Sequence, residues 1–113
     1  MTTHALAEQS LDFSVAIVRL CNNIERHGVL KNQLLRSATS IGANIHEGVY
    51  ASSGGDFVAK YQIALKECYE TEYWLKILQR AEIVSREEIA MLLHQCGSIR
   101  RMLIASLKTA KKV

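Results

Sequence analysis

Apolar residues recur every three or four positions along almost the whole chain, which is the spacing of one face of an α-helix. This pattern predicts four helices, over residues 10–26, 30–51, 56–81 and 86–108. Because the connections between them are short, consecutive helices should lie antiparallel. We therefore expect one domain, residues 1–113, folded as an all-α, antiparallel up-down-up-down four-helix bundle.

Each predicted helix has one apolar stripe that we expect to face a common core. In chain order the stripes comprise Phe13, Val15, Ile17, Leu20, Cys21 and Ile24; Leu34, Ala38, Ile41, Ile45 and Val49; Phe57, Tyr61, Ala64, Cys68, Leu75 and Leu78; and Ile89, Leu92, Cys96, Ile99, Leu103 and Leu107. Thr71 is a polar interruption in the third stripe.

Local signals mark the ends of these helices. Gly28 is a natural C-cap for the first helix. The Ser-Ser-Gly-Gly stretch at residues 52–55 is the clearest loop, and Asp56 after it is the expected N-cap of the third helix. Ser85 and Glu88 form a capping box at the start of the fourth helix.

Composition supports the helical prediction and narrows the class of protein. The 113 residues include no proline, so nothing interrupts long helices. The composition excludes collagens, disulfide scaffolds and multidomain enzymes. Three well-separated cysteines without a CxxC pair indicate reduced, buried thiols. No signal peptide or membrane-spanning stretch is recognisable, and we expect a cytoplasmic protein without membrane contact.

The residues offer no recognisable catalytic chemistry. No glutamate has a histidine three residues later, as a di-iron bundle requires. His46 and Glu47 resemble the start of a zinc-protease helix, but Tyr50 stands at the second histidine position. His46 and His94 are interpreted as packed or surface histidines. We expect neither an enzyme nor a metal or cofactor, and a small-molecule or metal-binding bundle has the weakest support.

A polar line on the second helix is the first candidate site. Arg36, Ser40, Asn44 and Glu47 follow one another at spacings of 4, 4 and 3, which places them along one line. Glu70 on the antiparallel third helix is the expected partner of Arg36. These groups form either a polar layer that fixes helix register or a ligand site. In the first case Glu70→Ala lowers the melting temperature; in the second it leaves the melt unchanged and loses partner binding.

Two glycines in the same helix, Gly42 and Gly48, are poor helix formers. We interpret them as positions where another helix approaches closely. Asn44 between them could form a hydrogen bond across an interface.

The second helix also carries a recognisable motif. Residues 33–48 read QLLRSATSIGANIHEG. This segment resembles the signature of a bacterial four-helix-bundle family whose founding members are encoded in intervening sequences of 23S ribosomal RNA genes. In that family an Arg is followed by Ser-Ile and then Asn-Ile-Ala-Glu-Gly. The pattern continues through Phe57 to a Glu-x-Glu matched by Glu70 and Glu72, and departs at His46, where alanine is usual.

The resemblance covers residues 10–108 and implies more than the fold. It implies a ring-like homo-oligomer, a pentamer, in which subunits share a surface. It also implies kinship with accessory proteins of diversity-generating retroelements, which are similar basic pentamers that bind nucleic acid and a reverse transcriptase.

The end of the chain is the second candidate site. The formal net charge is only +3, but every acidic residue precedes Ile89. The last 25 residues carry five cations, within an arc of about 120° that points away from the apolar stripe: Arg100, Arg101, Lys108, Lys111 and Lys112. They either form a surface for an anionic partner or are solvated charges that complement the helix dipole. Aromatic side chains on which unpaired bases could stack are sparse, since this helix has none, and sequence-specific reading is not expected.

Two functions follow from these features. The first is a non-enzymatic oligomeric accessory protein that binds RNA or DNA, with a reverse transcriptase or ribonucleoprotein as a further partner. The alternative is a protein-interaction scaffold without nucleic acid, anchored by Tyr50, Tyr69, Tyr73 and Trp74. The same aromatic residues could instead seal the subunit interface.

Overall fold

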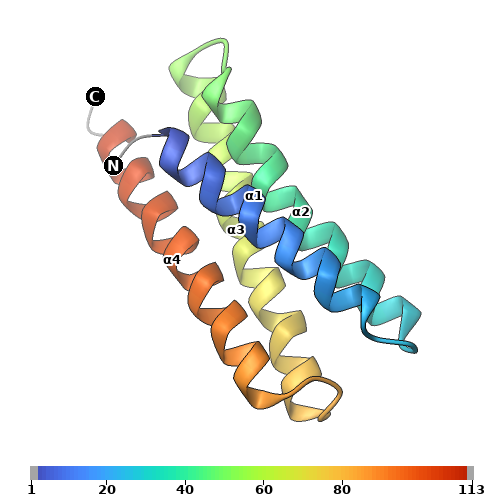
Figure 1. Cartoon of the computed structure of the whole chain (residues 1–113). Coiled ribbons are helices and arrows are strands. Elements are labelled where there is room, and N and C mark those ends of the chain that lie inside the picture. Colours follow the sequence, from blue (N-terminus) through green and yellow to red (C-terminus); the bar gives the residue numbers. More distant parts are fainter. Residues whose placement is uncertain (1–2, 112–113) are drawn as a thin grey trace.

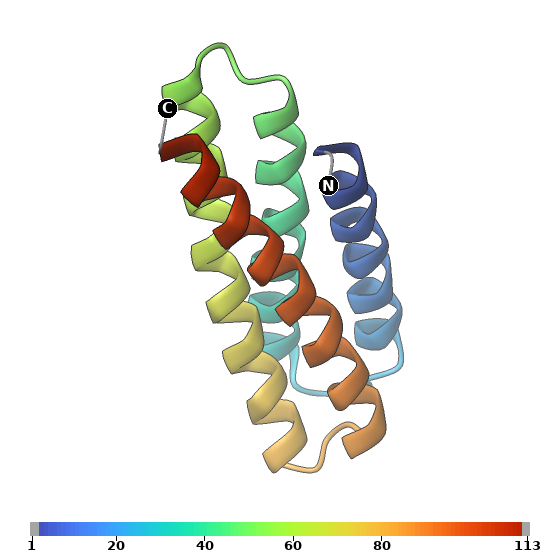
Figure 2. The ribbon, with the colours of Figure 1, turned by 90° about the vertical axis from the view of Figure 1, so that its left-hand side faces the viewer.

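The computed structural model describes residues 3–111 as four α-helices (Figure 1). They are α1 (Thr3–Asn22), α2 (Gly28–Val49), α3 (Gly54–Arg80) and α4 (Arg86–Lys111). Each helix runs antiparallel to the one before it (Figures 1 and 2). Contacts join α1 to α2, α2 to α3 and α3 to α4, and α4 returns to α1. The predicted all-α, antiparallel four-helix bundle is confirmed.

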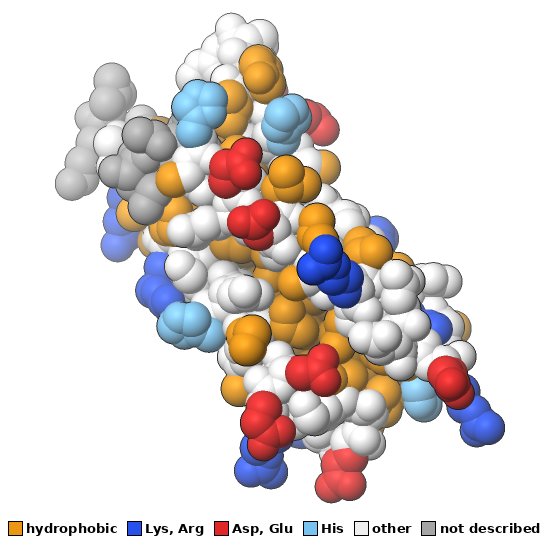
Figure 3. Space-filling view, viewed as in Figure 1, with side chains coloured by type: hydrophobic (Ala, Val, Ile, Leu, Met, Phe, Trp, Pro, Cys, Tyr) orange, Lys and Arg blue, Asp and Glu red, His pale blue; other side chains and the backbone are white. Residues whose placement is uncertain are grey.

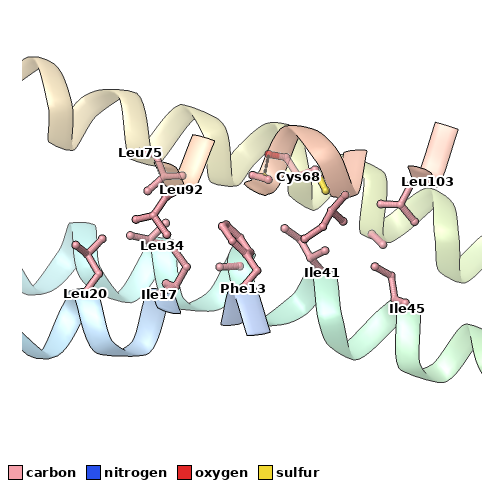
Figure 4. Close-up of a cluster of buried hydrophobic side chains, with 14 of the residues drawn as sticks. Phe13, Ile17, Leu20, Leu34, Ile41, Ile45, Cys68, Leu75, Leu92 and Leu103 are labelled. Carbon is pink, nitrogen blue, oxygen red and sulfur yellow. Dashed lines mark hydrogen bonds between the residues drawn. The ribbon is translucent and has the colours of Figure 1, made fainter. Parts of the chain in front are cut away.

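The apolar stripes meet inside the bundle, as Figure 4 shows for Phe13, Ile17 and Leu34. Nearly all of their members are buried. Val49 and Phe57 are half-buried, and Val15 is 41% exposed, so the predicted place of Val15 in the first stripe is wrong. Val15 lies about 200° around the helix from Phe13 and therefore faces away from the core. The three cysteines are unpaired and buried, as expected.

The first helix differs most from its prediction, beginning seven residues earlier and ending four residues earlier. Leu6 explains the early start, because it is buried and continues the apolar stripe by two further turns. The predicted C-cap at Gly28 is wrong, since Gly28 is the first residue of α2. His27, with a φ of 64°, adopts the left-handed conformation that we had expected of the glycine.

The third helix begins at a cap different from the predicted one. Ser53 is the N-cap, and its hydroxyl accepts a hydrogen bond from the backbone N–H of Asp56 at 3.1 Å. The Asp56 carboxylate reaches back to the backbone N–H of Ser52 at 3.1 Å. Asp56 therefore occupies the third helical position, and the two loop glycines form the first turn. At α4, Ser85 accepts from the Glu88 N–H at 3.2 Å, as predicted.

Small and polar residues set how closely the helices pack. Gly48 lies against the ring of Tyr61, and Gly42 lies against Ser14 and the backbone of α1. The close approach predicted at these glycines therefore occurs within one chain. Thr71, the polar interruption, is fully buried and donates a 2.9 Å hydrogen bond to the hydroxyl of Ser37. This bond fixes α2 against α3 in the core.

Candidate functional site

An ion-pair cluster joins α2 to α3 at the edge of the core. Nη1 of Arg36 contacts Oε2 of Glu67 at 3.1 Å, and Nη2 contacts Oε2 of Glu70. The indole Nε1 of Trp74 also donates to Oε2 of Glu70, at 2.9 Å. Because the α3 residues are spaced by three and four, they share the edge of that helix that faces α2. The structure thus forms the Arg36–Glu70 contact that the sequence predicts.

The cluster runs from solvent into the protein. The Arg36 side chain is 50% exposed, whereas that of Glu67 is only 11% exposed. One guanidinium lies between two carboxylates, so the cluster carries an excess negative charge. Hydrogen bonds from Trp74 and Arg36 lower the pKa of Glu70 below its ordinary value. The ionised carboxylate is therefore the form that the folded protein stabilises.

This shift predicts a loss of stability in acid. Because the pKa of Glu70 is lowered in the folded state, its contribution is complete above the ordinary carboxyl pKa and is lost as the pH falls through the lowered value. We expect urea denaturation near neutral pH to show Glu70→Gln less stable than the parent. The difference should shrink at about pH 3. A difference that stays constant over this range would contradict the assignment.

The remaining members of the polar line do not join this cluster. The Asn44 side-chain amide donates to the Ser40 carbonyl at 2.9 Å and to its hydroxyl at 3.1 Å, within the same helix. Glu47 pairs with Lys60 of α3 at 3.1 Å. The line is therefore divided into separate polar groups rather than one network. A hydrogen bond from Asn44 to another subunit stays a prediction.

A second ion pair joins α3 to α4. Nε of Arg100 contacts Oε2 of Glu72 at 3.2 Å, and its guanidinium carbon lies 5.7 Å from the centre of the Tyr69 ring. Arg100 is therefore paired with a carboxylate within the chain. A helical wheel drawn for α4 alone places Arg100 outside the apolar stripe, but it cannot show the carboxylate that the neighbouring helix supplies.

The other cations of the end segment differ in their surroundings. Arg101 and Lys108 are exposed and form no ion pair within the described part of the chain. Lys112 and the side chain of Lys111 lie outside the described residues. Figure 3 shows basic side chains along the outer edge of α4 and acidic side chains over α1 and the start of α4. The part of α4 that follows Glu88 therefore presents cations without acidic residues.

The comparisons with known proteins decide the family. Residues 3–105 match the model of the 23S rRNA-intervening sequence protein family. The chain belongs to this family. A protein of unknown function from the S23 ribosomal protein family of Bacteroides thetaiotaomicron is 43% identical, and its crystal structure superposes with a TM-score of 0.88. The match covers 91% of this chain and 98% of that one. No curated protein matches.

This match confirms the family resemblance predicted from the motif in the second helix. The names of the family and of the Bacteroides protein mention no catalytic activity. In this family member, the residues from 3 to 111 hold no group of three histidine, cysteine or acidic side chains suited to a metal ion. None of its described helices is long and apolar enough to span a bilayer.

Several histidine and tyrosine side chains of this family member lie on the surface. His46 and His94 are surface residues, and His46 contacts the ring of Tyr50 edge-on at 5.3 Å. Tyr50, Tyr69 and Tyr73 are exposed. Sequence reasoning singled out these tyrosines but did not place any of them beside the basic helix, because the packing of α3 on α4 brings Tyr69 there.

Proposed function

We propose that this protein is a non-enzymatic homo-oligomer that binds RNA or DNA through the basic surface of α4. The observation that carries the proposal is the exposure of Arg101 and Lys108, two cations seven residues apart on one side of α4 without an ion-pair partner in the described chain. Lysine and arginine that are free in this way release counterions from a phosphate backbone on binding. Such contacts fix position but carry little sequence information.

A homo-oligomer would multiply this charge. Leu11, Val15 and Val18 form an exposed apolar line on α1, at spacings of four and three. Apolar lines of this kind commonly mark protein contacts, which supports self-association. The resemblance points to a pentamer, and light scattering of the purified protein measures the subunit number. A ring of subunits would present its basic helices together to a nucleic acid or to a ribonucleoprotein containing a reverse transcriptase.

Neutralising the two free cations provides the test. We expect the Arg101→Gln/Lys108→Gln variant to bind RNA and DNA more weakly than the parent. The slope of log affinity against log salt should fall by about 1 for each cation that contacts a phosphate. Fluorescence anisotropy over a salt series measures both quantities.

The matched control is Arg19→Gln/Arg26→Gln, which removes the same charge from α1 and the connection after it. If the control loses as much affinity as the α4 variant, the binding is not localised to α4. Absence of binding by the parent at about 50 mM salt, or a salt slope near zero, would overturn the proposal.

The exposed tyrosines favour a second candidate, a protein-interaction scaffold without nucleic acid, because exposed aromatic side chains often anchor interfaces. Co-purification from the native host separates the two candidates. A stoichiometric protein partner in a preparation free of nucleic acid would favour the scaffold.

A further inference from the structure

An exposed line on α3 has two tyrosines in the middle and cations on either side of them. Its members follow one another at spacings of 3, 4, 3 and 4, so they lie along one side of the helix. All five side chains are exposed, and none is acidic: Lys66, Tyr69, Tyr73, Lys76 and Arg80. We call these five residues the tyrosine line. The line spans 14 residue steps, or about 21 Å along the helix axis.

The tyrosine line borders the cations of α4. Figure 2 shows α3 and α4 side by side. Arg100 of α4 lies over the ring of Tyr69, and its Nε pairs with Oε2 of Glu72. At Gly97 a side chain is absent, and the guanidinium nitrogens of Arg100 and Arg101 lie 3.4 and 3.3 Å from the place where a Cβ would stand. The guanidinium groups of both arginines therefore lie over Gly97, beside α3.

Arg100 therefore differs from an unpaired cation that is available to bind a phosphate group. Its charge is balanced by Glu72, and its flat guanidinium contacts one side of the Tyr69 ring. The guanidinium lies within cation–π distance of the ring, and Tyr69 stays 52% exposed. Tyr73, one turn further, is 59% exposed and contacts the Trp74 ring at 5.1 Å between centroids. Both tyrosines are thus supported by a neighbour and remain open to solvent.

Resting on the proposed function, we infer that the tyrosine line and the adjacent cations of α4 bind single-stranded nucleic acid. Unpaired bases would stack on Tyr69 and Tyr73, and the phosphates would contact the lysine and arginine side chains on either side. Exposed aromatic rings within a basic surface are the usual means of binding single strands without sequence preference. A duplex keeps its bases stacked inside, so it would contact only the cations. In this arrangement α3 supplies the aromatic rings that α4 lacks.

The test compares single-stranded and duplex oligonucleotides of roughly 20 nucleotides, longer than a typical site of about 4–16 nucleotides. Anisotropy titrations of oligo(dT) and of a blunt duplex at the same salt should show tighter binding of the single strand. Tyr73→Leu should weaken single-strand binding by about fivefold or more, with duplex binding and the salt slope unchanged.

The single tryptophan, Trp74, provides a second readout, because a base stacked on Tyr73 should quench the fluorescence of Trp74.

Tyr50→Leu is the matched control, since Tyr50 is an exposed tyrosine at the C-terminal end of α2. It should bind both oligonucleotides as the parent does. Equal binding of single strand and duplex, with no effect of Tyr73→Leu, would overturn the stacking inference and leave the proposed function intact. No binding of either oligonucleotide would overturn both. A changed subunit number in Tyr73→Leu would assign this tyrosine to a subunit interface and would also overturn the inference.

Discussion

Gly48→Ala is expected to destabilise the bundle by about 2 kcal/mol, the cost of overpacking a filled core. For a domain of this size, that corresponds to a melting temperature lower by roughly 8 °C. The direction is opposite to the usual one. Within a helix, alanine is more favourable than glycine by up to about 1 kcal/mol, and Gly48 is the last residue but one of α2.

The cause is the ring of Tyr61. A Cβ at position 48 would lie 2.6 Å from Cε1 and 2.9 Å from Cδ1 of this ring. Tyr61 is fully buried, and its ring centre lies 4.1 Å from that of Phe57. The ring cannot swing into solvent to make room, so α2 and α3 must move apart. The Tyr61 hydroxyl is buried and forms no hydrogen bond with the described residues. Its burial also raises the pKa of Tyr61.

Gly97→Ala is the control, because Gly97 is also a buried glycine inside a helix. The nearest atoms to its added Cβ are the ends of two arginine side chains, at 3.3 and 3.4 Å. Such flexible ends can give way by a few tenths of an ångström, a shift small enough to keep the ion pair of Arg100 with Glu72. This variant should melt at the parent temperature or above it. Thermal melts at one protein concentration measure both variants, since the melting temperature of an oligomer depends on concentration. Equal melting temperatures for Gly48→Ala and the parent would contradict the steric argument.

The parts of the fold that depend on one helix at a time were predictable from sequence. The stripe through Ile89 and Leu107 is buried as expected, because a helix with one apolar face can bury it in only one way. The start of α1 was not predictable in the same way. Leu6 alone indicates the additional turns, and its burial depends on the neighbouring helices. Gly28 is the first residue of α2, and His27 before it adopts the left-handed conformation.

The candidate sites show the same division. The Arg36–Glu70 contact follows from helix spacing and antiparallel order, and the structure forms it. The additional contact to Glu67 depends on how far α2 and α3 are rotated toward each other, which sequence spacing does not specify. The Arg100–Glu72 pair depends likewise on the rotation of α4 against α3. Side chains at the border between two helices are therefore where single-helix reasoning is weakest.

The contact between Arg36 and Glu67 leads to the second large effect. Arg36→Ala would leave the carboxylate of Glu67, only 11% exposed, without its ion-pair partner. Removing one partner of a fully buried pair costs about 3–5 kcal/mol. Because Arg36 is half exposed and water can reach its place, we expect a smaller loss of about 2 kcal/mol in the free energy of unfolding.

The size of the loss should depend on which partner is removed. Glu70→Ala should cost less than Arg36→Ala, because Arg36 then keeps its 3.1 Å contact with the more buried Glu67. The double variant Arg36→Leu/Glu67→Leu should recover much of the stability, since apolar side chains replace the more buried pair. The Glu70 carboxylate remains, but its side chain is 32% exposed and it keeps the hydrogen bond from Trp74. Urea denaturation of the variants, with the pairwise term taken from a double-mutant cycle, measures these differences. If Glu70→Ala proves as costly as Arg36→Ala, the stability of the cluster does not depend on neutralising Glu67.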